Sequence, residues 1–284
     1  MKLATYLSDS GPRVAGVRDG QLIDLNQADP QVPACIRNLL AQGPAGLKAA
    51  AAALEKGQPL GEVRLLAPVP KPQKIICIGL NYADHAKESG MEPPPEPVVF
   101  NKFLTAVAAH EDEVVVPAIS ESVDYEAELV AVIGVGGRNI PESEALNHVA
   151  GYACGNDVSA RDWQLNKPGK QWLLGKSFDG FAPFGPYLVT ADEVGDPSNL
   201  RIALRLNGET LQDSRTDQLI FGIPALVSYI SQVCTLVPGD VIFTGTPPGV
   251  GFARKPPVLL KGGDVCEVEI EKVGLLRNRF VASK

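Results

Sequence analysis

The chain has 284 residues, of which 45% are hydrophobic and 21% are charged, which is typical of a globular protein with a sizeable core. Its formal net charge is −7, from 26 Lys and Arg residues against 33 Asp and Glu residues, and the absence of a basic cluster argues against nucleic-acid binding. No apolar run approaches the roughly 18 residues of a membrane helix. The start of the chain resembles neither a signal peptide nor a transit peptide, so no membrane partner and a cytoplasmic location are expected.

Residues 1–70 predict a small N-terminal α+β domain. Short strands are expected at residues 2–7, 13–18 and 21–24, and helices at residues 33–42 and 44–56. The Asp19-Gly20 step between the second and third strands is typical of a tight β-hairpin turn. Three prolines within residues 68–72 then favour a stiff, extended linker, so a second domain is predicted over residues 71–284.

The second domain is predicted to be rich in strands. Strand candidates lie at residues 74–79, 98–100, 113–116, 126–135, 187–189, 201–206, 241–244, 265–271 and 275–281. Helices are expected at residues 82–89, 142–149, 159–165 and 224–233. The Asn207-Gly208 step marks another hairpin. Because strands outnumber helices, the pattern favours a β-rich α+β fold with an antiparallel or mixed sheet rather than a doubly wound parallel one.

Three acidic residues in strand-like segments form a candidate metal site. Glu126 and Glu128 begin one segment, and because side chains alternate along a strand, both carboxylates lie on one face. Two such charges beside an apolar segment repel each other and lose solvation unless a cation lies between them. Asp157 ends the strand-like residues 151–157 and could supply a third oxygen. A set of carboxylates without a His or Cys cluster suits Mg²⁺, Mn²⁺ or Ca²⁺ rather than Zn²⁺. The alternative is an acidic strand on a solvated face.

A histidine and a glutamate three residues apart form a candidate general base. His85 and Glu88 follow the first buried strand of the second domain and share one face of the helix predicted there. A carboxylate beside an imidazole orients the ring for proton transfer, although an exposed surface pair is the alternative. The proline-rich residues 89–97 cannot form regular structure. They are interpreted as a lid over the site with Gly90 near one hinge, or as a plain surface connection.

Four more polar residues are candidates for substrate contacts. Arg161 and Gln164 are three apart on a predicted helix, so they share a face on which the arginine could hold an anionic oxygen. The alternative is an Arg161–Asp162 pair at the surface. Lys176 and Thr246 lie in stretches rich in glycine and proline, where they could present a cation and a hydroxyl to an anion. Either residue could instead belong to an ordinary surface connection.

Taken in chain order, these motifs resemble those of the fumarylacetoacetate hydrolase superfamily. They are Asn-Tyr-x-x-His-x-x-Glu, Glu-x-Glu, Asn-Asp-Val-Ser-Ala-Arg-Asp-Trp-Gln, Gly-Lys-Ser-Phe-Asp and Pro-Gly-Asp-Val-Ile-Phe-Thr-Gly-Thr-Pro-x-Gly-Val-Gly. The resemblance runs from about Lys74 to Phe280 and is nearest to the fumarylacetoacetate hydrolase domain-containing proteins. It implies a mixed β-sandwich roll, usually dimeric, whose lid orders when ligand binds. It also implies metal ligands at Glu126, Glu128 and Asp157, a His85–Glu88 dyad, and substrate or oxyanion contacts at Arg161, Gln164, Lys176 and Thr246.

The resemblance further implies a hydrolase that depends on Mg²⁺ or Mn²⁺ and cleaves a C–C bond in a 2,4-dioxo acid such as an acylpyruvate, with Ca²⁺ possible in crystals. His85, supported by Glu88, would activate water, and Lys176 with Gln164 would stabilise the oxyanion. The same site suits two alternatives, oxaloacetate decarboxylation and keto–enol tautomerisation or isomerisation of an oxo acid. A metal-binding protein without activity is a third. The expected partners are a small anionic oxo acid and a second copy of the chain.

Overall fold

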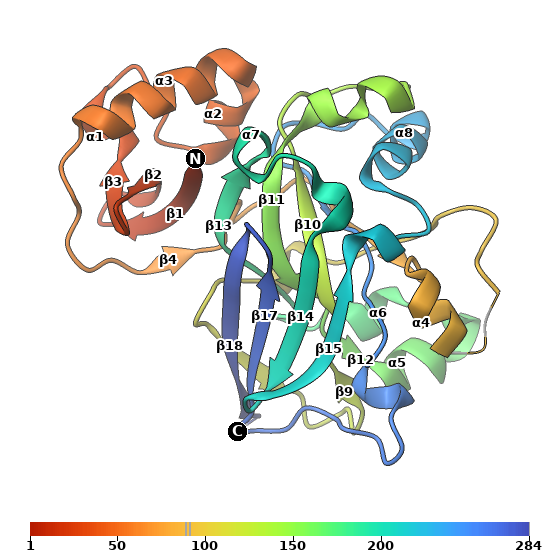
Figure 1. Cartoon of the computed structure of the whole chain (residues 1–284). Helices are drawn as coiled ribbons and strands as arrows, with labels where there is room; N and C mark the ends of the chain where they lie inside the picture. The colour runs from red at the N-terminus through yellow and green to blue at the C-terminus, as the bar shows by residue number, and fades with distance from the viewer. Residues whose placement is uncertain (89, 91, 284) are drawn as a thin grey trace.

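The computed structural model describes residues 1–88, 90 and 92–283 (Figure 1). The chain begins with an antiparallel meander of β1 (Lys2–Ser8), β2 (Gly11–Arg18) and β3 (Gln21–Asp24). Asp19 and Gly20 have φ angles of 51° and 76°, the left-handed pair that a two-residue hairpin needs. The predicted turn and the three predicted strands are therefore confirmed.

Three helices pack on this meander, α1 (Leu25–Ala28), α2 (Ile36–Ala41) and α3 (Gly43–Lys56). The α3 helix forms because its alanines favour the helical state and its proline lies in the first turn, where no helical hydrogen bond is lost. Its buried side chains include Ala50, Ala53 and Leu54. Leu54 approaches β2 so closely that a Cβ on Gly16 would lie 2.8 Å from a leucine methyl group, so a larger residue there would require Leu54 to shift.

Within the described residues, eleven strands form one mixed sheet in the order β3-β2-β1-β13-β11-β10-β16-β5-β6, with β4 against β1 and β7 against β13. The remaining strands of this sheet are β4 (Leu65–Leu66), β5 (Ile75–Gly79), β6 (Val98–Asn101), β7 (Val107–Ala108), β10 (Ala127–Ile133), β11 (Val149–Asn156), β13 (Ala182–Thr190) and β16 (Val241–Phe243). Leu3 of β1 pairs with Leu188 of β13, so the N-terminal strands continue the sheet of the larger part. A domain boundary near residue 70 stays a prediction.

A second sheet has the order β15-β14-β17-β18-β8 and lies across the first, as Figure 1 shows for β14, β17 and β18 in front of β10 and β11. Its strands are β8 (Glu113–Val116), β14 (Arg201–Leu206), β15 (Glu209–Arg215), β17 (Val265–Ile270) and β18 (Gly274–Ala282). Cys266, Val268 and Ile270 alternate along β17 and are buried, which is how one face of a sheet packs on another. This strand-rich architecture, with two large sheets packed together, confirms the predicted α+β fold class.

Three elements differ from their predicted form. The helix expected at residues 159–165 covers only Arg161–Leu165, because Ser159 and Ala160 form a short strand. The strand expected at residues 187–189 is the longer β13, which includes Pro183 and Pro186, residues that are uncommon inside strands. The helix expected at residues 142–149 is the 3₁₀ helix η2 (Glu142–His148), whose one buried side chain, Ala145, gives too narrow an apolar face for a packed α-helix. The other 3₁₀ helices in the described chain are η1 (Leu104–Ala106), η3 (Pro168–Lys170), η4 (Pro197–Asn199), η5 (Thr216–Gln218) and η6 (Gly251–Ala253).

The pairing of β10 with β11 positions the candidate site. Both strands are buried along their whole length, and Ala127 pairs with Asn156 in antiparallel register, so the start of β10 lies beside the end of β11. Short elements gather at this end of the sheets (Figure 1), namely α4 (Ala83–Glu88), β9 (Val123–Asp124), β12 (Ser159–Ala160), α5 (Arg161–Leu165) and α6 (Leu173–Lys176). At the opposite end lie α7 (Ala191–Val194) and α8 (Ile223–Val233). None of the helices in the described ranges has the length and apolar character to cross a membrane.

Candidate metal centre and active site

Three buried carboxylates meet where β10 begins and β11 ends. Each of Glu126, Glu128 and Asp157 offers an oxygen, and these oxygens all lie within 4.8 Å of one another. The three residues are 7%, 1% and 0% exposed. Carboxylate oxygens are the ligands that hard divalent cations prefer, so the donor set fits Mg²⁺ or Mn²⁺. The predicted clustering of these three side chains is what the structure shows, and their role as metal ligands stays a prediction.

Two lysines lie against the carboxylates. Lys176 Nζ donates to Glu126 Oε2 at 2.9 Å and to Asp157 Oδ2 at 3.0 Å. Lys102 Nζ lies 2.5 Å from Asp157 Oδ1 and donates to the backbone oxygens of Val158 and Phe181. Asp157 Oδ1 nonetheless accepts no hydrogen bond of normal geometry from the described residues. A buried carboxylate oxygen without such a bond fits the requirements of a metal ligand.

The two glutamates have opposite electrostatic environments. Burial raises the pKa of Glu128 well above its usual range, and the carboxylates of Asp157 and Glu126 raise it further. Burial also raises the pKa of Glu126, but the positive charges of Lys176 and Arg161 outweigh that effect and lower it to about 2. A bound cation would act in the opposite direction, since it favours the deprotonated form that metal ligands need.

Arg161 connects the carboxylates to a second buried acid, Asp124. Its Nε and Nη2 atoms donate to Asp124 Oδ2 at 2.9 and 2.8 Å, and Nη2 lies 2.7 Å from Glu126 Oε1. Asp124 also accepts hydrogen bonds from the backbone N–H groups of Gly251 and Phe252 at 2.8 and 3.1 Å. This acid therefore fixes both Arg161 and the loop that follows β16. It stands two residues before Glu126, but nothing in the sequence pattern distinguished it.

The helix face predicted for Arg161 and Gln164 is present. Arg161 Nη1 donates to Gln164 Oε1 at 3.0 Å, and both side chains are buried. Asp162, the alternative surface partner of the arginine, instead accepts a hydrogen bond from Ser120 Oγ at 2.7 Å. Gln164 is therefore joined to the carboxylate cluster through the arginine.

The histidine and glutamate of α4 are paired as predicted. His85 Nδ1 lies 3.2 Å from Glu88 Oε2, with side-chain exposures of 13% and 35%. Glu88 also accepts from the backbone N–H of Gly249, with N···O distances of 3.2 and 3.1 Å, so the end of α4 is tied to the loop after β16. Across the described chain, no hydrogen bond or ion pair joins His85 directly to the three carboxylates.

The predicted lid follows α4. Ser89 and Met91 lie outside the described residues, whereas Gly90, the expected hinge, has a φ of 63° that favours glycine. Near the other end of this segment, Glu96 Oε2 accepts a hydrogen bond from Tyr229 OH at 3.0 Å. The segment is therefore attached to α8 at that end, and its role as a lid stays a prediction.

The loop after β16 carries the last predicted residue, Thr246. The preceding residue, Gly245, donates its backbone N–H to Glu128 Oε2 at 2.8 Å, so the loop that carries Thr246 is bound to one of the carboxylates. Thr246 Oγ1 accepts a hydrogen bond from Gln212 Nε2 of β15 at 2.9 Å. Gln212 is 1% exposed and, like Lys102, was not identified from the sequence because an isolated polar residue in a strand is usually solvated.

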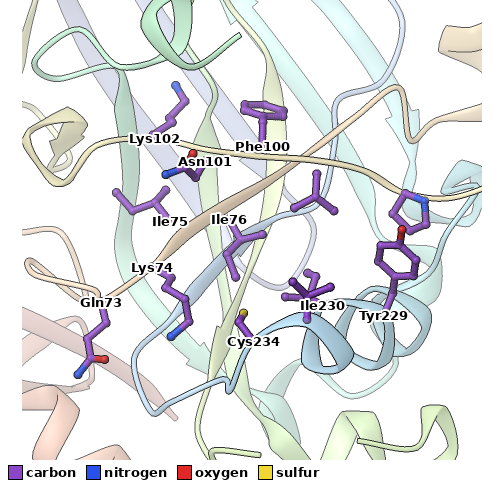
Figure 2. Close-up of a pocket in the computed structure, with 13 residues that line it drawn as sticks. Gln73, Lys74, Ile75, Ile76, Phe100, Asn101, Lys102, Tyr229, Ile230 and Cys234 are labelled. Carbon is purple, nitrogen blue, oxygen red and sulfur yellow. The ribbon is translucent and has the colours of Figure 1, made fainter. Parts of the chain in front are cut away.

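A separate pocket lies between β5, β6 and α8 (Figure 2). It is an open pocket of about 590 Å³, and its walls include Ile76, Phe100, Ile230 and Cys234. None of the three carboxylates lines it. Lys102 is at its edge, with the ammonium group turned away from the other labelled side chains in Figure 2 and toward Asp157. Its mainly apolar lining lacks the convergent polar groups of a catalytic site, so the carboxylate cluster is the better candidate.

Comparison with known proteins is consistent with this geometry. The family model described as fumarylacetoacetate (FAA) hydrolase C-terminal matches residues 74–281. A Xenopus laevis relative named oxaloacetate tautomerase fahd2, mitochondrial, is 50% identical over 288 residues, which cover 99% of this chain and 90% of that protein. A fumarylacetoacetate hydrolase from Exiguobacterium antarcticum has a TM-score of 0.87 and 37% identity over 100% of both chains. A maleylpyruvate hydrolase from Sphingobium sp. SYK-6, in complex with manganese(II) and pyruvate, has a TM-score of 0.82 and 34% identity, also over 100% of both chains.

These relatives also correct one prediction. Proteins 49–50% identical to this chain are named as mitochondrial, so the predicted cytoplasmic location is wrong. That prediction was a default, and neither a fold nor the chemistry of a site specifies a compartment. The family assignment itself rests on the match over residues 74–281 and on relatives that align along nearly the whole sequence. The chain belongs to the fumarylacetoacetate hydrolase family.

Proposed function

We propose that this protein is a keto–enol tautomerase of oxaloacetate or a closely similar 2-oxo dicarboxylic acid. The observation that carries the proposal is the 50% identity, over 99% of this chain, to a relative named oxaloacetate tautomerase. The C–C hydrolase predicted first from the sequence becomes the second candidate. It is favoured by the structural similarity to a maleylpyruvate hydrolase at 34% identity.

Glu126, Glu128 and Asp157 would hold a divalent cation, Mg²⁺ or Mn²⁺, which as a Lewis acid would polarise the 2-oxo group of the substrate. The solved structure of the manganese complex of a family neighbour supports this choice of ions. Arg161 would keep Glu126 ionised and fixed, because the guanidinium contacts both that carboxylate and Asp124. The metal site is thereby held in place by groups that do not have to touch the substrate.

Tautomerisation moves one proton between C3 and the oxygen on C2, and His85 would carry it. The imidazole Nδ1 would donate to Glu88, which leaves Nε2 as the basic atom that accepts the proton from C3. Lys176 has three N–H groups, and two of them bind Glu126 and Asp157. The third would donate to the oxygen on C2 as negative charge develops there. In a hydrolase the same histidine would instead deprotonate a water molecule.

The test compares three reactions of the protein supplied with Mg²⁺ or Mn²⁺. The ultraviolet absorbance of enol-oxaloacetate reports tautomerisation, pyruvate release reports decarboxylation, and absorbance loss from acetylpyruvate reports C–C cleavage. Each rate is compared with metal in buffer, because free metal ions also act on oxo acids. We expect enol-oxaloacetate to be consumed well above that rate without matching release of pyruvate. Cleavage of acetylpyruvate, with oxaloacetate reacting only at the buffer rate, would make the hydrolase the correct function.

We also propose a homodimer, as the family resemblance implies. Light scattering on the eluting peak of a size-exclusion column measures the mass directly. A mass near twice the 30.1 kDa of one chain supports the proposal, and a mass near 30 kDa contradicts it.

A further inference from the structure

Gln212 makes three hydrogen bonds at the edge of the candidate site. Its Oε1 accepts from the backbone N–H of Ala127 at 2.9 Å. Its Nε2 donates to Pro247 O at 2.7 Å and to Thr246 Oγ1 at 2.9 Å. Ala127 lies between two of the carboxylates, so this one side chain connects β10 to the loop after β16.

The orientation of the Gln212 amide is fixed by its backbone partners. The N–H of Ala127 can only donate and the carbonyl of Pro247 can only accept. Reversing the amide would place two donors face to face at Ala127 and two acceptors face to face at Pro247. The Nε2 group has two hydrogens, so one serves Pro247 and the other serves Thr246.

The hydroxyl of Thr246 must therefore act as an acceptor toward Gln212, which leaves its own hydrogen free. Among the residues that the structure describes, no group accepts that hydrogen. Thr246 is 6% exposed and follows Gly245, whose N–H binds Glu128 Oε2 at 2.8 Å. The free O–H is thus a neutral donor in the loop that binds Glu128.

The side-chain NH₂ of Gln164 is also left as a donor by its hydrogen-bond partner. Arg161 has donors only, and its Nη1 donates to Gln164 Oε1 at 3.0 Å, so the NH₂ group of Gln164 points away from this bond as a donor. Two neutral donors therefore accompany the carboxylate cluster, each set by a neighbour that cannot reverse its role. Such donors bind a ligand oxygen that only accepts, such as that of an ionised carboxylate.

We propose that Gln212 is a positioning residue that keeps the Thr246 hydroxyl a donor to a carboxylate oxygen of the substrate. The inference rests on the proposed function for the identity of the substrate. It does not depend on which reaction follows binding, because tautomerisation, decarboxylation and hydrolysis of an oxo acid all begin with the same bound carboxylate.

Gln212→Glu tests the polarity directly. The carboxylate keeps an acceptor for Ala127 but has no hydrogen to give, so Thr246 would donate to it and lose its donor role. Thr246→Val removes the hydroxyl at nearly constant shape. The wild type, the two single variants and the double variant form a double-mutant cycle. Calorimetry measures the binding of oxalate to each Mn²⁺-loaded protein, a readout that needs no turnover. Gln232→Glu on the exposed face of α8 is the matched control for added charge.

Each single variant is expected to weaken oxalate binding roughly ten- to a hundredfold, the effect of losing one hydrogen bond to a charged group. In the Thr246→Val background, the loss of oxalate affinity caused by Gln212→Glu should be at least about tenfold smaller than in the wild type, because the hydroxyl is already gone. Gln232→Glu should leave oxalate binding unchanged. An equal loss from Gln212→Glu in both backgrounds, or no loss in the wild type, overturns the proposal, as does a wild-type protein that binds Mn²⁺ but not oxalate.

Two further measurements keep the outcome clear. The Mn²⁺ affinity of each variant separates loss of metal from loss of oxalate, and if Gln212→Glu does not fold, Thr246→Ser against Thr246→Val tests the donor alone. Serine should retain oxalate binding and valine should lose it, and equal binding by both overturns the proposal. If oxalate follows the predicted cycle while no oxo acid is tautomerised, the proposed function fails and the role of Gln212 stands.

Discussion

The backbone N–H of Asp157 donates to the carbonyl of Glu126 at 2.9 Å, so two of the three clustered carboxylates belong to residues joined by one backbone hydrogen bond. This bond extends the β10–β11 ladder by one step beyond Ala127 and Asn156. The spacing of the carboxylates is therefore set by strand register rather than by flexible loops. A site built on paired strands holds its ligands more firmly than a site built on loops, as tight binding of a divalent ion requires.

Glu128→Gln should weaken Mn²⁺ binding by roughly a hundredfold or more, because substitutions merely adjacent to metal ligands already cost about 10- to 100-fold. Glutamine keeps the shape and can still accept from Gly245 N–H, so the fold should persist. Titration followed by the electron paramagnetic resonance of free Mn²⁺ measures the affinity. Glu113, an exposed residue of β8, is changed to Gln as the control, and unchanged Mn²⁺ affinity in Glu128→Gln would exclude Glu128 from the metal site.

Lys102→Met should destabilise the metal-free protein, since it leaves the fully buried Asp157 without one of its two cationic partners. The loss should be smaller than the roughly 3–5 kcal/mol of a buried charge left with no partner, because Lys176 remains. Added Mn²⁺ should raise the melting temperature of this variant more than that of the wild type, because the metal replaces the missing positive charge. Differential scanning calorimetry with and without Mn²⁺ measures both effects. Lys48→Met, at an exposed position, serves as the control. A Lys102→Met protein that is as stable as the wild type without metal would show that Lys102 does not stabilise Asp157.

His85→Ala should lower the turnover of enol-oxaloacetate by about 10²–10⁴-fold, the usual contribution of a general acid or base. Mn²⁺ affinity should be unchanged, because His85 contacts none of the three carboxylates among the described residues. Glu88→Gln should give a smaller loss, since the amide can still hold the imidazole in place. Deuterium exchange at C3, followed by nuclear magnetic resonance, detects proton transfer independently of absorbance. Full exchange by His85→Ala would remove the histidine from the mechanism.

The stability of the N-terminal strands should depend on pH through Asp24. Burial alone would raise the pKa of this carboxyl, but hydrogen bonds from Arg13 and Tyr6 outweigh it and lower the pKa below 3.8. The carboxyl of Asp24 then binds a proton more readily in the unfolded chain than in the folded one. Stability therefore rises with pH between the lowered pKa of the folded state and the ordinary pKa of the unfolded state. The contribution of Asp24 to stability is fully present at a pH above its ordinary pKa. It is lost as the pH falls through the lowered pKa of the folded state.

Asp24→Asn should therefore be less stable than the wild type at pH 7, and the difference should shrink as the pH falls below 3.8. Urea unfolding at several pH values measures it. A difference in free energy of unfolding that stays constant down to pH 2 would contradict the lowered pKa of Asp24.

Much of the fold could be predicted because it depends on local signals. The Asp19-Gly20 and Asn207-Gly208 hairpins are present as predicted, since both pairs adopt the left-handed conformations that their residue types favour. The strand predicted at residues 187–189 is shorter than β13 because prolines such as Pro183 and Pro186 are uncommon inside strands. Pro183 pairs with Ala108 of β7, and Pro186 follows Gly185, which pairs with Cys154 of β11; these partners lie far away in the sequence.

In the candidate site too, local signals could be predicted and long-range contacts could not. Glu126 and Glu128 could be recognised from their spacing within one segment. Lys102 and Gln212 could not, because their partners lie far away in the sequence, as at Asp157 and Ala127, and no short motif encodes a contact of that range. The structure therefore adds to the predicted site those residues, such as Lys102 and Gln212, that hold other site residues in position.

The central claim is that the three carboxylates hold a divalent ion that enables the protein to interconvert the tautomers of oxaloacetate. The most direct test follows the absorbance of enol-oxaloacetate with wild type and Glu128→Gln, each after removal of metal and again after addition of Mn²⁺. We predict that wild-type activity disappears with the metal and returns with Mn²⁺, while the variant stays near the rate of Mn²⁺ in buffer. Equal acceleration by metal-free and Mn²⁺-loaded wild type would contradict the claim.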